Sequence, residues 1–508
     1  MNGAHALLRT LVGNGVDTCF TNPGTSEMHF VAALDDVPEM RAVLTLFEGV
    51  ATGAADGYGR MAGRPAATLL HLGPGLGNGL ANLHNARRAG TPIVNIIGDH
   101  AIPHQPLDAP LQSDIETVAR NVSQWIRSSN APADVTRDAL DAIAAARAGS
   151  VATLILPADA SWSEGAELVP AAPIVLRTAR VPEEPIDLAV KALQSGEPAA
   201  LLLGGALDEA TLVAAARIAA ATGAKLLCET FPARCARGAG LPAVERLGYL
   251  AEFAVAQLDG LRHLVLAGAK APVSFFAYPG KPSELVPAGC DVVDVGAARL
   301  TTLAERLHAE AEPVRAPAAR PERPTGALTA QSLAAAIGAV LPEGAIVSDE
   351  ANTAGLFVAG ATAGAPRHDW LNLTGGAIGQ GMPAATGAAV ACPDRPVLSL
   401  EADGSAMYTL QSLWTQARED LDVTTVIFNN RSYAILNLEL SRVGARTGGH
   451  AAELFDLSRP PLDFVALARG MGVDAVRAET ADDVVRGLER ALAEPGPHLI
   501  DAILPPGL

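Results

Sequence analysis

Two polar segments in the C-terminal part of the chain constrain the fold most, because each follows directly after a short apolar run. Asp403 comes after Pro396–Leu400, and Asn430 comes after Thr424–Phe428. The small pair Gly404-Ser405 opens a helix between the two runs. The carboxyl ends of parallel strands meet at one edge of a sheet, so Asp403 and Asn430 are expected to converge. Oxygen ligands suit Mg²⁺, and helix N-terminal amides can face a diphosphate. The sequence therefore predicts a magnesium–diphosphate site.

The composition is that of an acidic globular enzyme. The 508 residues are enough for about three domains of ordinary size. A formal net charge of −18 and an aromatic content of 4% argue against a protein that binds nucleic acid. The first residues lack the pattern of a secretory signal, and no run reaches the roughly 18 apolar residues of a membrane span. We therefore expect a cytoplasmic protein, with its five scattered cysteines reduced.

Two Pro- and Ala-rich stretches, residues 169–185 and 309–325, are interpreted as linkers. They predict domains over residues 1–168, 185–310 and 326–508. Each domain alternates short β-branched runs with Ala- and Gly-rich helical patterns, which is typical of parallel α/β sheets. The predicted fold class is therefore α/β, with three doubly wound parallel-sheet domains. The shared rhythm of the outer domains also suggests a duplicated domain.

The strands that the apolar runs predict are short. In the first domain they cover residues 16–20, 41–46, 66–70 and 92–97, with helices over 49–61 and 78–88. In the middle domain they cover residues 199–203, 225–228, 263–267 and 291–295, and in the third 345–348, 396–400, 424–428 and 498–504.

Glu48 is the first candidate catalytic residue, because it stands between an apolar strand and a Gly- and Ala-rich helix. One interpretation is a carboxylate favoured by the N-terminal end of the helix dipole. The other is a carboxyl group in apolar surroundings, with a raised pKa, that hydrogen-bonds a heterocycle nitrogen. Both remain open from the residues alone.

Three histidines are candidate proton donors. His71 ends an apolar strand just before Gly-Pro-Gly, where it has either a structural role or a role in a substrate pocket. His100 and His104 are alternative donors or solvated loop histidines. The pair Phe275-Phe276 could wall an apolar pocket or pack between domains. Gly204-Gly205 alone is too weak to indicate a flavin or nicotinamide site.

With these features, the chain resembles the thiamine diphosphate-dependent 2-keto acid enzymes, the family of acetolactate synthase and benzoylformate decarboxylase. The resemblance rests on Asn22-Pro-Gly, on Glu48 followed by Ala-Asp-Gly-Tyr, and on the metal site, and it runs nearly end to end. It implies a pyrimidine-binding first domain, a six-stranded α/β middle domain and a diphosphate-binding third domain. It also implies thiamine diphosphate and Mg²⁺ as cofactors, and a homodimer or homotetramer with the active site between two subunits.

The resemblance also implies residue roles. Glu48 is similar to the glutamate that protonates the cofactor's pyrimidine ring, and Asp403, Asn430 and the backbone carbonyl of Ser432 are similar to the magnesium ligands. Ile378 resembles the apolar residue that holds the cofactor bent. The other implied cofactor contacts are Asn22, Gly24, Asn352, Thr353, Gly376, Ala402, Gly404, Ser405 and Tyr433. The implied substrate-pocket residues are Thr25, His71, Gln112 and Ile435.

Two departures from the family pattern bear on the reaction. Ala402 replaces the first glycine of the usual Gly-Asp-Gly, which we expect to be tolerated. Glu439 stands where acetolactate synthases have a tryptophan, and the chain stops soon after its last strand. The resemblance therefore implies decarboxylation of a 2-keto acid through an enamine, with aldehyde release, carboligation or both. The alternatives are a true acetolactate synthase catalytic subunit and an inactive family member that serves as a partner or regulatory subunit.

Overall fold

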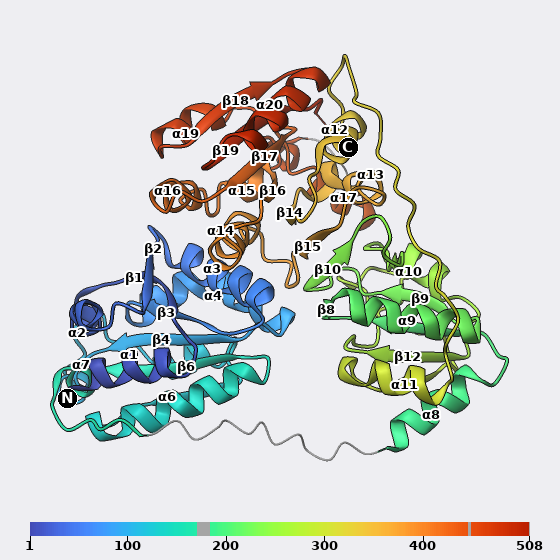
Figure 1. Ribbon diagram of the computed structural model, residues 1–508. Coiled ribbons are helices and arrows are strands. Elements are labelled where there is room, and N and C mark those ends of the chain that lie inside the picture. The colour runs from blue at the N-terminus through green and yellow to red at the C-terminus, as the bar shows by residue number, and fades with distance from the viewer. Residues whose placement is uncertain (170–182, 446–448, 507–508) are drawn as a thin grey trace.

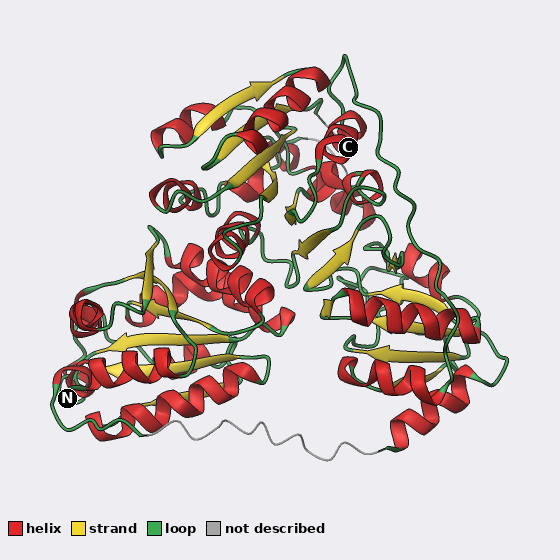
Figure 2. Ribbon diagram, viewed as in Figure 1, coloured by secondary structure: helices red, strands yellow, loops and turns green. Residues whose placement is uncertain are grey.

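The computed structural model describes residues 1–169, 183–445 and 449–506, and it contains three parallel-sheet units (Figures 1 and 2). The N-terminal unit lies at the lower left of Figure 1, the middle unit at the lower right and the C-terminal unit at the top. The predicted linker at 169–185 falls mostly outside the described residues. The second linker, residues 309–325, runs along the outside of the middle unit up to the C-terminal unit. No helix among the described residues is long and apolar enough to cross a membrane.

The N-terminal sheet has six parallel strands in the order β2-β1-β3-β4-β6-β5. Helices α1 and α6 cover one face, and α3 and α4 cover the other (Figure 1). The elements are α1 (Gly3–Gly13), β1 (Thr18–Asn22), α2 (Met28–Ala33), β2 (Arg41–Leu44), α3 (Glu48–Ala62), β3 (Ala66–Leu70), α4 (Leu72–Ala89), β4 (Ile93–Asp99), α5 (Ile115–Ala119), β5 (Trp125–Ser128), α6 (Pro132–Arg147), β6 (Val151–Pro157) and α7 (Ala158–Trp162).

The middle sheet has five parallel strands among the described residues, in the order β11-β9-β7-β12-β13, not the six that the family resemblance implied. Two short strands of this unit, β8 and β10, pair elsewhere. The elements are α8 (Glu184–Leu193), β7 (Ala199–Leu203), β8 (Ala206–Leu207), α9 (Glu209–Thr222), β9 (Lys225–Cys228), β10 (Arg234–Arg237), β11 (Glu245–Arg246), α10 (Ala251–Leu258), β12 (His263–Ala267), β13 (Asp291–Asp294) and α11 (Leu300–Arg306).

The C-terminal sheet has eight strands, in the order β18-β19-β17-β16-β14-β15-β10-β8. Its last two strands come from the middle unit, and β10 pairs antiparallel with β15. The elements are α12 (Ala330–Val340), β14 (Ile346–Glu350), α13 (Val358–Ala361), β15 (His368–Asn372), α14 (Gly381–Ala391), β16 (Val397–Ala402), α15 (Asp403–Ala406), α16 (Ser412–Arg418), β17 (Val423–Asn429), α17 (Ala434–Arg442), α18 (His450–Glu453), α19 (Phe464–Gly470), β18 (Asp474–Ala478), α20 (Ala481–Ala493) and β19 (His498–Ile503).

The six strands that the C-terminal unit itself supplies repeat the order of the N-terminal sheet. Numbered along the chain from β14, they run second, first, third, fourth, sixth, fifth, as the N-terminal strands do. This identity of topology agrees with the duplicated domain that the shared rhythm suggested. Along the chain, helix α3 connects the second strand of its sheet to the third, and helix α14 does the same in the C-terminal unit. The two helices pack against each other (Figure 1).

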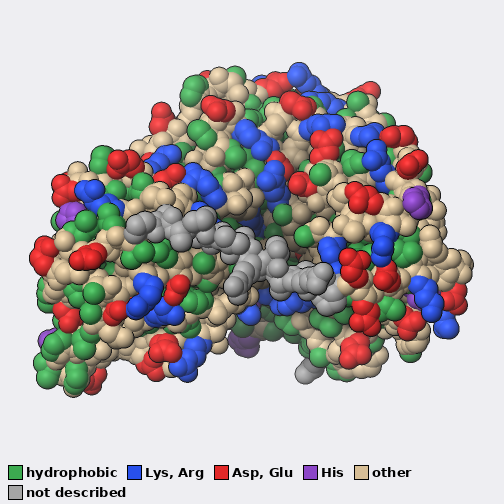
Figure 3. All heavy atoms as spheres, turned by 60° about the horizontal axis from the view of Figure 1, so that its bottom comes forward, with side chains coloured by type: hydrophobic (Ala, Val, Ile, Leu, Met, Phe, Trp, Pro, Cys, Tyr) green, Lys and Arg blue, Asp and Glu red, His purple; other side chains and the backbone are tan. Residues whose placement is uncertain are grey.

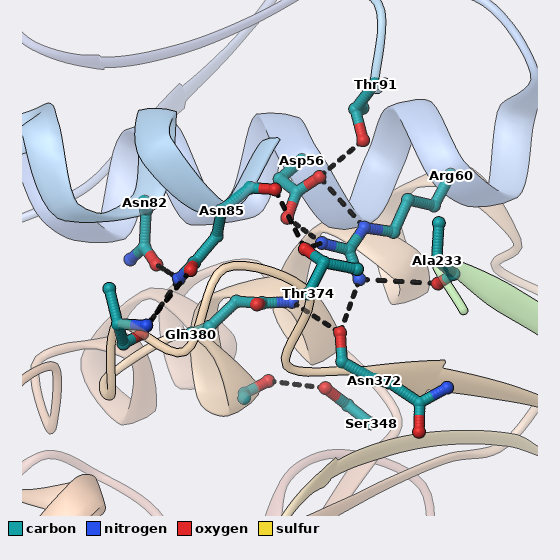
Figure 4. Close-up of polar contacts among 12 residues, drawn as sticks. Asp56, Arg60, Asn82, Asn85, Thr91, Ala233, Ser348, Asn372, Thr374 and Gln380 are labelled. Atoms are coloured by element: carbon teal, nitrogen blue, oxygen red, sulfur yellow. Dashed lines mark hydrogen bonds and ion pairs between the residues drawn. The ribbon is translucent and has the colours of Figure 1, made fainter. Parts of the chain in front are cut away.

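The packing of α3 on α14 is very close. A Cβ atom on Gly57 would lie 2.0 Å from the carbonyl oxygen of Ala384, and one on Gly387 would lie 1.8 Å from that of Ala54. Beside this crossing, Arg60 binds Asp56 on its own helix, the carbonyl oxygen of Asn372 at 2.7 Å and that of Ala233 at 3.3 Å (Figure 4). One buried guanidinium group therefore contacts all three units.

The predicted strands agree with the observed ones to within a few residues, but one predicted helix does not. The helix expected over residues 78–88 begins at Leu72 instead, so the Gly-Pro-Gly segment is helical. Pro74 is tolerated there because the first turn of a helix has no internal partner for its amide groups. His71 consequently lies directly before a helix of eighteen residues.

Candidate active site

The C-terminal sheet carries a pocket at the carboxyl ends of β14, β16 and β17, next to the point where its strand order reverses. Doubly wound sheets bind their ligands at such positions. The pocket is lined by Ala351, Asn352, Thr353, Ala354, Ile378, Ala402, Asp403, Gly404, Ser405, Phe428, Asn430, Ser432, Tyr433, Ala434 and Ile435. Every C-terminal site residue predicted from the sequence lines it, except Gly376.

Asp403 is held in one orientation at the start of α15. Its side chain is buried, and its two carboxylate oxygens accept hydrogen bonds from the backbone N–H groups of Gly404, at 2.8 Å, and Arg431, at 2.6 Å. Burial raises the pKa of Asp403 to about 6, although the backbone N–H groups act in the opposite direction. A cation would offset this burial of charge, so the carboxylate fits a metal ligand.

Asn430 and Ser432 lie on either side of Arg431, which follows β17 and has a φ of 58°, in the left-handed region. The side-chain oxygen of Asn430 accepts a hydrogen bond from the N–H of Ser432 at 3.1 Å. Because all three predicted metal-binding residues line one pocket and offer oxygen atoms, the donor set fits Mg²⁺. Across the pocket, the side-chain amide of Asn352 donates to the Ser405 hydroxyl at 2.9 Å.

The helix between the two metal-binding strands differs from the prediction. It is divided into α15, which has four residues, and α16, which has seven. Such a short first segment has little dipole, so the side chains and single N–H groups of the pocket, and not a helix end, are the features that suit a diphosphate.

The N-terminal unit carries the other predicted residues. Glu48 begins α3, as expected, and its side chain accepts a hydrogen bond from Asn78 at 3.0 Å. It is only half-buried, so the described residues of one chain do not surround it with apolar groups. Asn22 ends β1, and Gly24 follows it on the same edge of the sheet.

His71 has a buried partner that the sequence did not reveal. The Nδ1 atom of His71 lies 2.9 Å from a carboxylate oxygen of Glu27, and the same oxygen accepts the N–H of Gly24 at 2.7 Å. Burial raises the pKa of Glu27, while the charge of His71 and the N–H of Gly24 lower it. This contact fixes the imidazole ring and makes Glu27 a residue that positions His71.

A second cavity, of about 340 Å³, adjoins this pair. Its lining includes Thr25, Leu72, His100 and His104, and the two imidazole rings are 5.3 Å apart. His104 is exposed, as expected of a solvated loop residue, whereas the Nε2 atom of His100 is buried without a hydrogen-bond partner among the described residues. Gln112 lies nearby in sequence but does not line the cavity, and its Oε1 atom is likewise buried and unpaired.

The two groups of site residues occupy equivalent places in the two sheets. Asp403 and Asn430 follow the third and fourth strands of the C-terminal unit, as His71 and His100 follow the third and fourth strands of the N-terminal unit. Within one chain the groups are separate, because neither Glu48 nor His71 lines the C-terminal pocket. Phe275 does not line it either, and its ring packs against Tyr249 at 4.8 Å.

Sequence reasoning also missed two acids beneath the C-terminal pocket. Glu350 ends β14 and Glu401 is the last residue but one of β16, and both are buried. Burial raises the pKa of Glu350 to about 7. Burial and the charge of Glu350 raise the pKa of Glu401 well above its usual range. Both residues follow, by one or two positions, the apolar runs that predict these strands, and nothing in the local sequence indicates that they are buried.

The comparisons with known proteins agree with this geometry. Residues 1–124 match the family model "Thiamine pyrophosphate enzyme, N-terminal TPP binding domain", and residues 355–502 match the corresponding C-terminal TPP binding domain. A Mycobacterium tuberculosis protein named "Putative acetolactate synthase large subunit IlvX" is 62% identical over 99% of both chains. Benzoylformate decarboxylase of Pseudomonas aeruginosa is 31% identical over 96% of both chains.

A solved structure is similar as well. The thiamine diphosphate-dependent 4-hydroxybenzoylformate decarboxylase of Rhodococcus jostii superposes with a TM-score of 0.85 and 25% identity, over 100% of both chains. The relatives and the solved structure thus align with nearly the whole chain, and the two family models match its N-terminal and C-terminal parts. The protein belongs to the thiamine pyrophosphate-dependent family of 2-keto acid enzymes.

Proposed function

We propose that this protein is a thiamine diphosphate- and Mg²⁺-dependent enzyme that decarboxylates 2-keto acids. It then releases an aldehyde or joins the acyl unit to a second carbonyl compound. The observation that carries this proposal is the single pocket in which oxygen donors of Asp403, Asn430 and Ser432 lie beside Ser405 and Ile378. When bound, thiamine diphosphate supplies the electron sink for the loss of carbon dioxide.

Different residues of the pocket have different roles in the proposed binding of Mg²⁺ and thiamine diphosphate. Asp403, Asn430 and the carbonyl oxygen of Ser432 would hold Mg²⁺. Ser405, Asn352 and Thr353 would bind the diphosphate, and Ile378 would pack against the cofactor. Tyr433 and Ile435 line the side from which the substrate approaches.

The catalytic acid comes from a second copy of the chain. Because Glu48 and His71 lie outside the C-terminal pocket of their own chain, a homodimer, or a tetramer built from such dimers, completes each site. Glu48 of the partner subunit would then be placed to donate a hydrogen bond to the cofactor's pyrimidine ring. His71, oriented by Glu27, steadies the substrate or delivers a proton to it. We place this enzyme in the cytoplasm, as the sequence predicts.

The second candidate is acetolactate synthesis from two molecules of pyruvate, which the name of the relative with 62% identity favours. The residue at the position of the family's tryptophan argues for a different acceptor site. Glu439 there accepts a hydrogen bond from the Tyr278 hydroxyl and lies 3.7 Å from Arg442. An inactive partner subunit is disfavoured because Glu48, Asp403 and Asn430 are all present.

The first test is binding of the cofactor. Calorimetric titration of thiamine diphosphate with Mg²⁺ should show saturable binding to the wild type and no magnesium-dependent binding to Asp403→Ala. Asp394→Ala, which removes an exposed carboxylate before β16, is the matched control and should bind normally. Equal affinity in all three proteins would remove the metal-site assignment.

The second test identifies the reaction. Pyruvate, branched and aromatic 2-keto acids are each supplied to the loaded enzyme, and carbon dioxide, aldehyde and carboligation products are quantified. Acetolactate from pyruvate alone would favour the second candidate. No turnover of any keto acid would favour the inactive partner.

A further inference from the structure

The loop that carries Ile378, residues Gly375–Gly381, connects β15 to α14 and is held on one side by the N-terminal unit. The side-chain amides of Asn82 and Asn85 on α4 donate to the carbonyl oxygens of Gly379, at 3.0 Å, and Ala377, at 2.8 Å. Figure 4 shows Asn82 and Asn85 pointing toward this segment. The loop carbonyls on either side of Ile378 are therefore tied to α4.

Glu350 holds the same loop from below. One carboxylate oxygen accepts the N–H of Gly379 and the other accepts the N–H of Gly381, both at 2.7 Å. The side chain is 2% exposed. Hydrogen bonds to a carboxylate are about twice as strong as neutral ones, so this bidentate contact is the strongest polar anchor that the structure gives the loop.

The loop at residues Gly375–Gly381 also packs directly against the side chains of Glu350 and Glu401, and it has no space to move toward them. A Cβ atom on Gly381 would be 2.1 Å from the nearer carboxylate oxygen of Glu401 and 2.9 Å from the Cβ atom of Glu350. The contact between Glu350 and the loop is therefore a close fit of backbone to carboxylate. A change at Glu350 must be taken up by the loop, because the strand beneath it is buried in the sheet.

We propose that Glu350 is a positioning residue for the cofactor. Its carboxylate fixes the position of Ile378 in the C-terminal pocket by accepting hydrogen bonds from the N–H groups of Gly379 and Gly381. The inference rests on the proposed function, because it assumes that Ile378 contacts thiamine diphosphate. Glu350 itself does not line the pocket and acts only through the loop.

The test replaces Glu350 with glutamine. The amide offers one acceptor oxygen where the carboxylate offers two, so either Gly379 or Gly381 loses its partner and faces an NH₂ group. We expect the affinity for thiamine diphosphate with Mg²⁺ to fall roughly 10- to 100-fold, as for other residues that orient a ligand-binding group. Hydrogen exchange of the Gly379 and Gly381 amides, followed by mass spectrometry of the free protein, should accelerate.

The matched control is Asp138→Asn. Asp138 is also 2% exposed, and it accepts hydrogen bonds from Arg127 and Ser129 on the far side of the N-terminal unit. This variant should lose stability but bind the cofactor like the wild type. If Glu350→Gln and Asp138→Asn bind equally well, the positioning role is overturned.

A double-variant cycle shows whether Glu350 acts through Ile378. Ile378→Ala should weaken cofactor binding, and adding Glu350→Gln should then weaken it little further. Independent, additive losses would overturn the inference. If Glu350→Gln does not fold, Glu350→Asp keeps the charge but is one methylene shorter, and unchanged affinity in that variant would overturn it too. A wild type that does not bind thiamine diphosphate would instead refute the proposed function.

Discussion

The contact between Glu27 and His71 gives the sharpest prediction about catalysis. In Glu27→Gln, the amide oxygen can occupy the place of the carboxylate oxygen that accepts both the Gly24 N–H and the His71 ring. The NH₂ group then occupies the place of the other oxygen, which is buried without a partner among the described residues. The glutamine variant therefore keeps both hydrogen bonds and removes the negative charge.

The size of the effect follows from this difference. A hydrogen bond that involves a charged group contributes about 1.5–3 kcal/mol and a neutral one about 0.5–1.5 kcal/mol. The charge on Glu27 therefore strengthens its hydrogen bond to His71 by about 1–1.5 kcal/mol. If this energy is lost in the transition state, the rate falls roughly tenfold. We expect kcat/KM for the best keto acid to fall roughly tenfold in Glu27→Gln. In Glu27→Leu, which loses orientation as well, the fall should be about 10- to 150-fold.

The assay is steady-state turnover at saturating thiamine diphosphate, with cofactor affinity measured in parallel. Glu39→Gln, which alters an exposed carboxylate of the same unit, is the control and should behave like the wild type. In a His71→Ala background, Glu27→Gln should have no further effect on kcat/KM. Wild-type kcat/KM in Glu27→Leu, or a full additional loss in the double variant, would refute the reasoning.

Three further predictions concern other titratable groups. Glu48→Gln should keep cofactor affinity but lower kcat by on the order of 10² to 10⁴, because an amide cannot transfer a proton; single-turnover kinetics measures this, and near-normal rates would make Glu48 a helix-start carboxylate only. Arg60→Met should destabilise the junction of the three units by about 3–5 kcal/mol, because the buried carboxylate of Asp56 loses its ionic partner and keeps, among the described residues, only the hydrogen bond from the Thr91 hydroxyl. An unchanged urea midpoint would contradict this. Burial lowers the pKa of His368 to about 4, so its contribution to stability is complete above pH about 6.5 and is lost as the pH falls toward 4, by roughly 3 kcal/mol. His368→Gln should flatten the pH dependence of the unfolding midpoint in that range, and an unaltered slope would assign it to other groups.

The parts of the fold and site that could be predicted are those fixed by local pattern. Asp403 and Asn430 were predicted together because each comes at the end of a mainly apolar strand, and the topology places both residues in one pocket. Glu48 was a candidate because of its place between an apolar run and a Gly- and Ala-rich helix, whereas Ile378 was predicted only from the resemblance to a family. In all these cases a short segment of sequence contains both the structural signal and the functional residue.

The parts that escaped depend on partners distant in sequence. Glu27 meets His71 across forty-four positions, and Glu350 meets Gly379 across twenty-nine. Neither acid differs in its local pattern from a surface glutamate. The start of α4 escaped for another reason, because its glycines and proline have low intrinsic helix propensity and tertiary packing overrides that preference.

The amino-acid composition gives the total charge of the chain but not how the charges are distributed over its surface. Acidic and basic side chains are interspersed over the face drawn in Figure 3, although the whole chain carries a formal charge of −18. Glu350 and Glu401, the two acids beneath the C-terminal pocket, are instead buried in the sheet. A net charge therefore says little about where the chemically important carboxyl groups lie.

The pairing of β10 with β15 limits how this enzyme could be recombined with its relatives. The linkers at 169–185 and 309–325 are the obvious places at which to exchange the whole middle segment for that of a relative. Such a graft would carry β8 and β10 with it and replace the edge of the sheet that also contains β14 and β16. The apolar core is continuous across the same boundary, with Leu203 and Val265 in one cluster with Trp370 and Leu398. A chimera that is to keep the strands β14, β16 and β17 in place must retain residues 206–237 from the parent that supplies the C-terminal sheet.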